Sequence, residues 1–476
     1  MTLARKRARS TVSRRPARHH STPSDKELNP ALFGTDGVRG VANADLTAEL
    51  ALALGRAVAR TIPATGFLVG RDTRRSGPLL QAAFSSGIAT EGADVVDVGV
   101  IPTPGLAFLS ANSALPAAMV SASHNDFPDN GIKLFGIDGK KLSVATEEQI
   151  EKEWNSILAD PDRPPIRPTG YGVGRIDTNT DMVGGYQEHL LSTQNGRSLD
   201  GIHIVLDCAN GAASDVAPFV LKELGATLTV IGCEPDGTNI NDGCGSTDPT
   251  RLAELVVSSS ADIGLALDGD ADRLVAVDAE GSVVDGDALL AMFALDLAER
   301  GKLSGNTVVV TVMTNLGFKL AMAERGIVVK ETPVGDRHVL AALDADGLAL
   351  GGEQSGHVVF RQLATTGDGI LTGLCLCDLL VRKGVSLREH ASGVVKRIPQ
   401  VLVNVPVATS AGLQDAAKVW ESVAKIEADL GDSGRVLVRA SGTEPLIRIM
   451  VESTSQVQAE DAAHKLRLVV KECLDG

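Results

Sequence analysis

Short apolar segments alternate with longer helix-like stretches along most of the chain, and this alternation begins anew three times. Strand-like segments lie at residues 66–71, 93–99 and 117–121, then at 202–208, 227–232 and 263–268, and then at 307–312, 327–330 and 348–351. Strands that alternate with helices in this way predict βαβ units. We therefore expect an α/β fold with three similar domains and mixed sheets.

The pattern changes near residue 398. Segments 400–407, 434–439 and 446–452 have the apolar character of strands, a charged amphipathic stretch lies between the first two, and a helical segment ends the chain. This order predicts a smaller α+β domain. We place a disordered basic tail at 1–30 and four domains at 31–185, 186–287, 288–397 and 398–476.

The composition favours a soluble, cytoplasmic protein. Of the 476 residues, 43% are hydrophobic, which is enough for several cores. The longest apolar runs, such as 263–267 and 308–312, are far shorter than the ~20 residues of a membrane helix. The six cysteines are scattered without metal-binding spacing, which predicts reduced thiols. We expect no membrane partner, and either a monomer or a homodimer.

Charge is distributed unevenly along the chain. Residues 1–30 carry eight Lys and Arg against two acidic residues, which leaves 37 basic and 58 acidic side chains and a formal net charge of −21 in the rest. Such a body repels nucleic acid unless a local basic patch intervenes. We expect no nucleic-acid partner, although the tail alone has the composition of a transit peptide or an RNA-binding arm.

Two polar loops that follow predicted strands suggest catalysis and metal binding. The first, at 121–125, reads Ser-Ala-Ser-His-Asn, and a positioned serine hydroxyl can be a nucleophile, although such residues also simply satisfy turn backbones. The second carries three aspartates at alternate positions, where mutual repulsion favours a divalent cation over three solvated carboxylates. These aspartates are Asp268, Asp270 and Asp272.

Three further polar loops suggest ligand binding. Residues 351–357 place Glu, Gln, Ser and His between glycines and suit a polyhydroxylated ligand, although a plain glycine turn is the alternative. Residues 439–448 combine two arginines, two hydroxyls and a glycine N–H, which suits a phosphate unless they form an ordinary exposed hairpin. Residues 33–40 form a glycine-rich turn that either presents Arg39 or is only structural. Because ligands bind in crevices outside strand ends, one shared cleft accounts for these loops together.

Five motifs, taken together, resemble in order and spacing those of the α-D-phosphohexomutase superfamily. They are FGTDGVRG (33–40), SASHN (121–125), DGDADR (268–273), GEQSGH (352–357) and RASGTEP (439–445). Within the superfamily, the phosphoglucosamine mutases are the most similar, on the basis of the Ser-Ala-Ser sequence, Gln354, NLGF (315–318), VGDRHV (334–339) and the segment 239–248. The similarity spans residues 31–476, so the tail lies outside it.

The resemblance implies a heart-shaped enzyme that interconverts glucosamine 6-phosphate and glucosamine 1-phosphate, feeding UDP-N-acetylglucosamine and cell-wall precursor synthesis. It implies a phosphoserine at Ser123, supported by Ser121, and a hexosamine 1,6-bisphosphate that turns round between two half-reactions. Phosphoryl transfer depends mainly on positioning and charge neutralisation, which one Mg²⁺ supplies. The implied roles are metal binding for Ser123, Asp268, Asp270 and Asp272, catalysis for Ser123, Lys133, His357 and Arg39, substrate binding for Arg273, Glu353 and Ser355, and phosphate binding for Arg439, Ser441, Gly442, Thr443 and Arg448.

One position departs from the superfamily pattern. Proline usually follows the His-Asn pair, whereas this chain has Asp126. The loop thereby loses a fixed φ and gains a negative charge near the phosphoserine, which bears on rate and metal affinity.

Other functions are compatible with the same residues. A phosphoglucomutase or phosphomannomutase of the same superfamily is one alternative, because sugar preference does not follow from the residues alone and rests on the resemblance. An aspartyl-phosphate phosphatase is suggested by Asp268 and Asp270 after an apolar strand, although Asp272 stands where such enzymes carry Thr or Val. A non-catalytic binder of sugar phosphate or nucleic acid that uses the basic tail is the remaining alternative, and deletion of residues 1–30 would test it.

Overall fold

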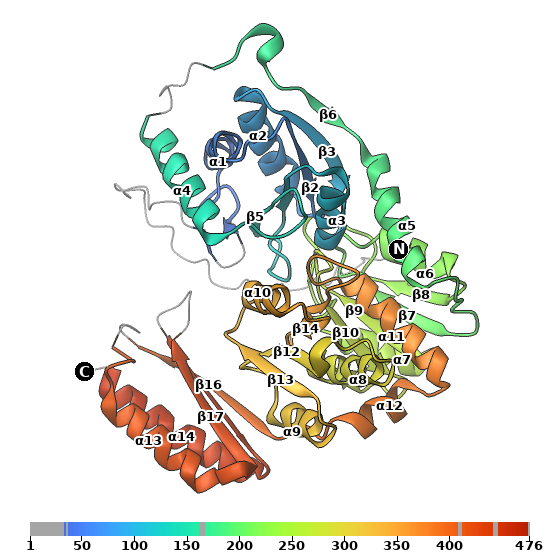
Figure 1. Ribbon diagram of the computed structural model, residues 1–476, viewed down its shortest axis with the longest axis vertical. Coiled ribbons are helices and arrows are strands. Elements are labelled where there is room, and N and C mark those ends of the chain that lie inside the picture. The colour runs from blue at the N-terminus through green and yellow to red at the C-terminus, as the bar shows by residue number, and fades with distance from the viewer. Residues whose placement is uncertain (1–32, 35–36, 161–166, 408–411, 441–445, 475–476) are drawn as a thin grey trace, which may run out of the picture.

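The computed structural model describes residues 33–34, 37–160, 167–407, 412–440 and 446–474, and these residues form four domains, each with its own sheet (Figure 1). The tail expected at 1–30 lies outside the described residues. The predicted fold class is confirmed, because three α/β domains with mixed sheets precede a smaller α+β domain. Among the described residues, no helix combines the length and apolar character needed to cross a bilayer.

Domain 1 contains a six-stranded sheet in the order β1-β5-β4-β2-β3-β6. Strands β2, β3, β4 and β6 are parallel, and β5 pairs antiparallel with both β4 and β1. Its elements are β1 (Val38–Val41), α1 (Ala48–Thr61), β2 (Gly66–Arg71), α2 (Gly77–Thr90), β3 (Asp94–Val100), α3 (Thr103–Ser113), β4 (Ala117–Val120), β5 (Asp129–Phe135), α4 (Val144–Ala159), a 3₁₀ turn at Gly170–Gly172 and β6 (Ile176–Thr178).

The glycine-rich segment 33–40 corrects one expectation. Instead of a turn throughout, residues Val38–Val41 form the edge strand β1, in which Arg39 lies opposite Gly131 of β5. The glycine-rich sequence did not predict this strand, because glycine has a low strand propensity. The strand forms through hydrogen bonds to β5, which lies about ninety residues further along the chain.

Helix α5 (Val183–Thr193), preceded by a 3₁₀ turn at Thr180–Met182, leads into domain 2, whose sheet has the order β11-β10-β9-β7-β8. Strands β7, β8 and β9 are parallel, and β10 runs antiparallel to β9. The elements are β7 (His203–Asp207), α6 (Val216–Glu223), β8 (Thr227–Ile231), α7 (Thr250–Ser258), β9 (Ile263–Leu267), β10 (Leu274–Asp278) and β11 (Val283–Val284).

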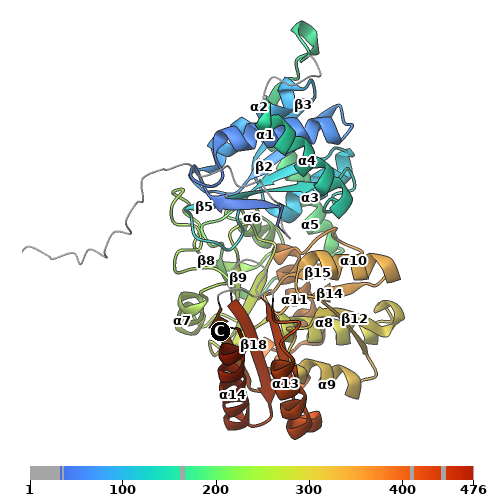
Figure 2. The ribbon, with the colours of Figure 1, turned by 90° about the vertical axis from the view of Figure 1, so that its left-hand side faces the viewer.

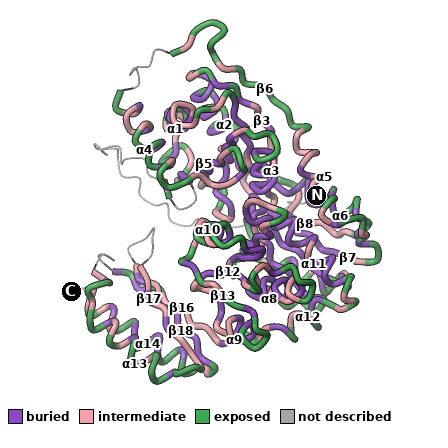
Figure 3. The backbone as a smooth tube through the Cα atoms, viewed as in Figure 1, coloured by how far each residue is buried: buried purple, intermediate pink, exposed green. Residues whose placement is uncertain are grey.

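Domain 3 has a four-stranded sheet in the order β13-β12-β14-β15, in which only β15 is antiparallel. Its elements are α8 (Gly286–Glu299), a 3₁₀ turn at Ser304–Asn306, β12 (Thr307–Thr311), α9 (Leu316–Glu324), β13 (Val328–Thr332), α10 (Asp336–Asp346), β14 (Leu350–Gly352), β15 (Val358–Phe360), α11 (Gly369–Lys383) and α12 (Leu387–Val394). One apolar core runs continuously from α5 through domains 2 and 3, and the buried backbone in this part of Figure 3 follows it.

Domain 4 is an antiparallel three-stranded sheet in the order β16-β18-β17 with two helices packed on one face (Figures 1 and 2). The elements are β16 (Gln400–Pro406), α13 (Ala417–Leu430), a 3₁₀ turn at Gly431–Ser433, β17 (Gly434–Ala440), β18 (Leu446–Ser453) and α14 (Gln456–Leu474). Its apolar core is separate from those of the other domains.

The first three domains repeat one connection. In each, a strand parallel to the central strand ends in a polar loop that turns back into an antiparallel neighbour: β4 into β5, β9 into β10, and β14 into β15. We call these connections the serine loop (121–128), the acidic loop (268–273) and the glutamate loop (353–357). The repeat places three of the five sequence motifs at the same topological position.

Candidate active site

Ser123 joins the serine loop of domain 1 to the acidic loop of domain 2. Its Oγ donates a 2.6 Å hydrogen bond to Asp268 Oδ2, and the residue is only 1% exposed. Its backbone N–H donates to Ser121 Oγ at 2.9 Å. Ser123 has φ +51°, a left-handed conformation that costs a non-glycine residue on the order of 1–2 kcal/mol. The serine is therefore held on the carboxylates in a conformation that it would not adopt alone.

Three aspartates of the acidic loop converge beneath Ser123. Asp268, Asp270 and Asp272 are all buried, and one carboxylate oxygen from each lies within 4.8 Å of the others. Burial, together with the charges of Asp272 and Asp270, raises the pKa of Asp268 well above its usual range. Burial also opposes ionisation of Asp272, but the charges of Lys133, His357 and Arg273 outweigh it and hold the pKa of Asp272 below its usual value.

This cluster fits a hard divalent cation. Among the described residues, Asp270 Oδ1 and Asp272 Oδ1 are buried without a hydrogen-bond partner, so both oxygens remain available as ligands. An all-oxygen set suits Mg²⁺ rather than zinc. Gly269 lets the two loops approach each other, because a Cβ there would lie 2.6 Å from the carbonyl oxygen of Ser123. The predicted cation site is thus present as a formed cluster.

Lys133 and Thr103 bring two further polar groups from domain 1 to Asp270. The Lys133 ammonium, on strand β5, lies 2.8 Å from Asp270 Oδ2 and 3.7 Å from Asp272 Oδ2. The Thr103 hydroxyl, at the start of α3, donates to the same Asp270 oxygen at 2.6 Å. Lys133 is 2% exposed, so it directly neutralises part of the buried negative charge.

His357 connects the glutamate loop with the acidic loop. Its Nδ1 lies 3.7 Å from Asp272 Oδ2, and its Nε2 accepts a 3.2 Å hydrogen bond from the backbone N–H of Gly367. Burial lowers the pKa of His357, but the hydrogen bond and charge of Asp272, with Asp336 and Glu353, outweigh it and raise the pKa above the usual value. The Gly367 N–H points at a lone pair on Nε2, so the proton of the neutral ring lies on Nδ1, toward Asp272.

Cationic side chains border the serine. The Nε of Arg273 lies 3.7 Å from Asp272 Oδ1, and its backbone N–H donates to Asp268 Oδ1 at 3.2 Å. Burial and the charges of Arg273 and Arg39 lower the pKa of His124 to about 4, so that ring is neutral near pH 7. The same positive potential favours an anion beside Ser123.

The remaining residues predicted to bind substrate lie in domains 3 and 4. Glu353 is half-buried and accepts the backbone N–H of Gly335 at 3.1 Å, whereas Ser355 is exposed. Arg439 of β17 and Arg448 of β18 lie opposite each other in the domain 4 sheet. Burial and the charge of Arg448 lower the pKa of Arg439. Ser441, Gly442 and Thr443 lie outside the described residues.

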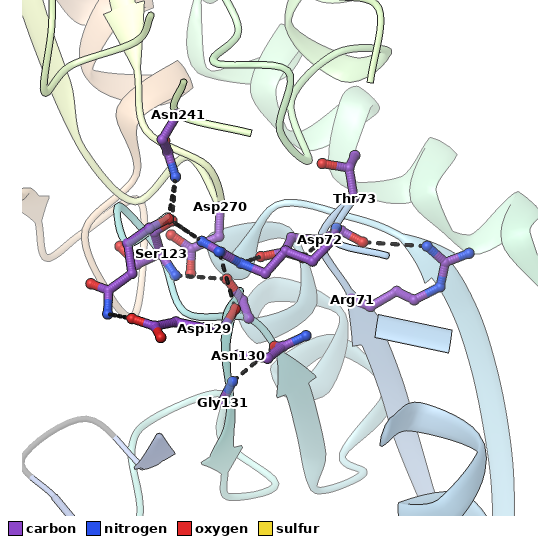
Figure 4. A network of polar contacts seen from close by, with 12 residues as sticks. Arg71, Asp72, Thr73, Ser123, Asp129, Asn130, Gly131, Asn241 and Asp270 are labelled. Atoms are coloured by element: carbon purple, nitrogen blue, oxygen red, sulfur yellow. Dashed lines mark hydrogen bonds and ion pairs between the residues drawn. The ribbon is translucent and has the colours of Figure 1, made fainter. Parts of the chain in front are cut away.

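Several polar residues of the site were missed by reasoning from the sequence. Asp72 and Arg74, which follow strand β2, and Asn241 of domain 2 all contact the serine loop or its partners, and Figure 4 shows this network around Ser123. The signal was present for the first two, because residues 72–74 read Asp-Thr-Arg directly after a buried strand. Asn241 lies in a long loop whose sequence alone indicates no partner.

Comparison with known proteins agrees with this geometry. Four models of phosphoglucomutase/phosphomannomutase domains match: the alpha/beta/alpha domains I, II and III at residues 30–160, 184–281 and 285–398, and the C-terminal domain at 402–469. The phosphoglucosamine mutase of Nocardia farcinica is 50% identical over 464 residues, covering 92% of this chain and 99% of that protein. That of Corynebacterium jeikeium is 51% identical over 451 residues, covering 93% and 99%.

Solved structures show the same fold. A phosphoglucomutase/phosphomannomutase family protein from Burkholderia thailandensis superimposes with a TM-score of 0.78 at 25% identity, covering 94% of this chain and 98% of that one. The N-acetylphosphoglucosamine mutase of Aspergillus fumigatus, solved with GlcNAc-6P and magnesium, superimposes with a TM-score of 0.63 at 19% identity, covering 93% and 95%. With four domain models matched in order and relatives half identical over nearly the whole chain, this protein belongs to the phosphoglucomutase/phosphomannomutase family, among its phosphoglucosamine mutases.

Proposed function

We propose that the chain interconverts glucosamine 6-phosphate and glucosamine 1-phosphate through a phosphoserine at Ser123 and a hexosamine 1,6-bisphosphate. The observation that supports this most directly is the 2.6 Å hydrogen bond between Ser123 Oγ and Asp268, which puts a buried hydroxyl on a cluster suited to a cation. Phosphoglucosamine mutases at 50% identity favour this substrate over glucose or mannose phosphates.

In the first half-reaction, a sugar hydroxyl oxygen attacks the phosphorus of the Ser123 phosphate and the bond from phosphorus to Oγ breaks. The hydroxyl proton leaves the sugar and Oγ regains one, with Lys133 and His357 as the groups placed to hold or pass it. The second half-reaction reverses these steps with the other phosphate of the bisphosphate. Asp268, Asp270 and Asp272, together with the Ser123 phosphate, would hold Mg²⁺, which would neutralise negative charge on the transferred group.

The other residues bind the two ends of the substrate. Arg39 and Arg273 contribute positive charge around Ser123, as their effect on His124 indicates. Glu353 and Ser355 are proposed to hold sugar hydroxyls or the amino group. We assign the remote phosphate to domain 4, where the paired arginines of β17 and β18 adjoin the segment 441–443. The set proposed there is Arg439, Ser441, Gly442, Thr443 and Arg448.

A cytoplasmic location is part of the proposal. All six cysteines carry free thiols, which suits a reducing compartment. The amino-sugar phosphate that the reaction produces would feed UDP-N-acetylglucosamine synthesis.

The phosphoserine is tested by comparing the wild-type protein with Ser123→Ala. After incubation with glucosamine 1,6-bisphosphate, the wild type should gain one phosphate by intact mass, mapped to Ser123 and stable to hydroxylamine. Ser123→Ala should gain none and lose turnover while still binding the phosphosugar. A hydroxylamine-sensitive phosphate on Asp268 would instead identify an aspartyl-phosphate enzyme, and equal turnover of glucose 1-phosphate would identify a phosphoglucomutase.

A further inference from the structure

Arg74 is a fully buried arginine whose side chain is surrounded by the serine loop. A guanidinium has five N–H groups, and every one is matched by an acceptor here. The Nε donates to Asp72 Oδ2 at 2.9 Å. The other four donate to backbone carbonyl oxygens of the loop and its exit: Nη2 to Ser123 and Asn125, both at 2.8 Å, and Nη1 to Asp126 at 2.5 Å and Asp129 at 3.1 Å.

Asn241 holds the same loop from domain 2. Its Nδ2 donates to the carbonyl oxygens of Ser123 and Asn125 at 2.9 and 3.0 Å, which are two of the four that Arg74 contacts. Asn241 is 7% exposed, and its own backbone N–H donates to Ala209 O at 3.0 Å. The Ser123 and Asn125 carbonyls are therefore fixed by donors from two domains, and Figure 4 shows Asn241 reaching Ser123.

Asp72 extends the network to the other side of the serine. It accepts the backbone N–H of Arg74 at 2.9 Å as well as the guanidinium. The Ser121 side chain is hydrogen-bonded to Asp72, and Ser121 Oγ accepts the N–H of Ser123. Both the N–H and the C=O of Ser123 are thus bound, and its Oγ lies 2.6 Å from Asp268 Oδ2 and 3.4 Å from His124 Nδ1.

The backbone of Ser123 needs such support. A residue at φ +51° persists in that conformation only when its surroundings determine it. The reaction in turn needs Oγ fixed, since in-line phosphoryl transfer tolerates little displacement and a 1 Å error costs about 100-fold in rate. Hydrogen bonds to the Ser123 carbonyl serve both needs, because they support the backbone conformation and fix the position of Oγ.

We propose that Arg74 and Asn241 are positioning residues that form a clamp, closed only when domains 1 and 2 are docked, which holds Ser123 Oγ in line over the acidic loop. This inference rests on the proposed role of Ser123 as the phosphorylated residue. Lysine cannot replace Arg74, because it has three N–H donors on a point charge instead of a planar fork that reaches five acceptors. Among the described residues, neither Arg74 nor Asn241 is hydrogen-bonded to Glu353, Ser355, Arg439 or Arg448, so we expect the clamp to act on turnover and to leave substrate affinity unchanged.

The test compares Asn241→Ala, Arg74→Lys, their double variant and Thr73→Val in the full-length protein. Thr73→Val is the matched control, because the Thr73 hydroxyl also reaches from domain 1 to domain 2, donating to Asn210 O at 2.6 Å, and makes no hydrogen bond to the serine loop among the described residues. We expect kcat to fall about 10-fold in Asn241→Ala and about 100-fold in Arg74→Lys, with KM unchanged, and kcat of Thr73→Val to stay near wild type. The double variant should lose less than the product of the single losses, because both residues act on the same carbonyls.

Each alternative result is decisive. If Arg74→Lys does not fold, as judged by circular dichroism, Asn241→Ala carries the test alone. A wild-type kcat in Asn241→Ala, a loss confined to KM, or an equal loss in Thr73→Val would overturn the clamp. Turnover that persists in Ser123→Ala would instead overturn the phosphoserine mechanism, so the two failures are distinguishable.

Discussion

Asp287 offers a quantitative test of how the junction between domains 3 and 4 is held. This residue of α8 is 3% exposed, and its Oδ2 accepts the backbone N–H of Asn315 at 2.8 Å. Glu452 of β18 accepts the Asn315 side chain at 2.9 Å. Burial, with the nearby charges of Asp285 and Glu452, raises the pKa of Asp287 to about 7, although the Asn315 hydrogen bond opposes the shift.

The magnitude follows from the pKa difference between folded and unfolded chain. A carboxyl with pKa 3.8 when unfolded and about 7 when folded differs by about 3 units, which corresponds to about 4 kcal/mol. Between these two pKa values the folded state binds more protons than the unfolded state. The contribution of Asp287 to the free energy of unfolding therefore falls as pH rises from about 4 to about 7 and is constant above that. Asp287→Asn removes the titration and retains an oxygen for the Asn315 N–H.

We expect Asp287→Asn to match the wild-type free energy of unfolding near pH 4 and to exceed it by up to about 4 kcal/mol at pH 8. Urea unfolding followed by the fluorescence of Trp420, in a Trp154→Phe background that leaves one tryptophan, reports on domain 4. Asp429→Asn, which removes an exposed carboxylate of the same domain, is the control and should show no such rise. A difference between Asp287→Asn and wild type that is constant from pH 4 to 8 would refute the reasoning.

Two further predictions concern the serine loop and the acidic loop. Asp126 is exposed, and among the described residues its backbone N–H makes no hydrogen bond. Asp126→Pro should therefore raise the free energy of unfolding by about 0.4–1 kcal/mol. A lower free energy of unfolding in urea titration would show that φ at this position does not suit proline. Mg²⁺ at 100 times its Kd should stabilise the metal-free protein by about 2.7 kcal/mol, whereas Asp272→Asn should lose most of this gain. An equal melting-temperature increase in both proteins would place the cation elsewhere.

Much of the site could be predicted because its signals are local. Asp268, Asp270 and Asp272 occupy alternate positions on one short loop, and any backbone that turns there brings their carboxylates together. The alternation of strands and helices likewise indicated three α/β domains and a smaller fourth one. These features depend on neighbours within a few residues, so they can be inferred from spacing and residue type.

Other features were decided only by the tertiary structure. Strand β1 exists because β5 supplies its hydrogen bonds, and the two are far apart in the chain. The carbonyl oxygen of Ser123 accepts hydrogen bonds from Arg74, 49 residues before it, and from Asn241, 118 residues after it. Hydrogen bonds across domains form only after packing has placed donor and acceptor together, and no residue pattern encodes that distance. The sequence alone therefore determined which chemical groups the candidate site contains, and the packing of the domains determined how Ser123 is held.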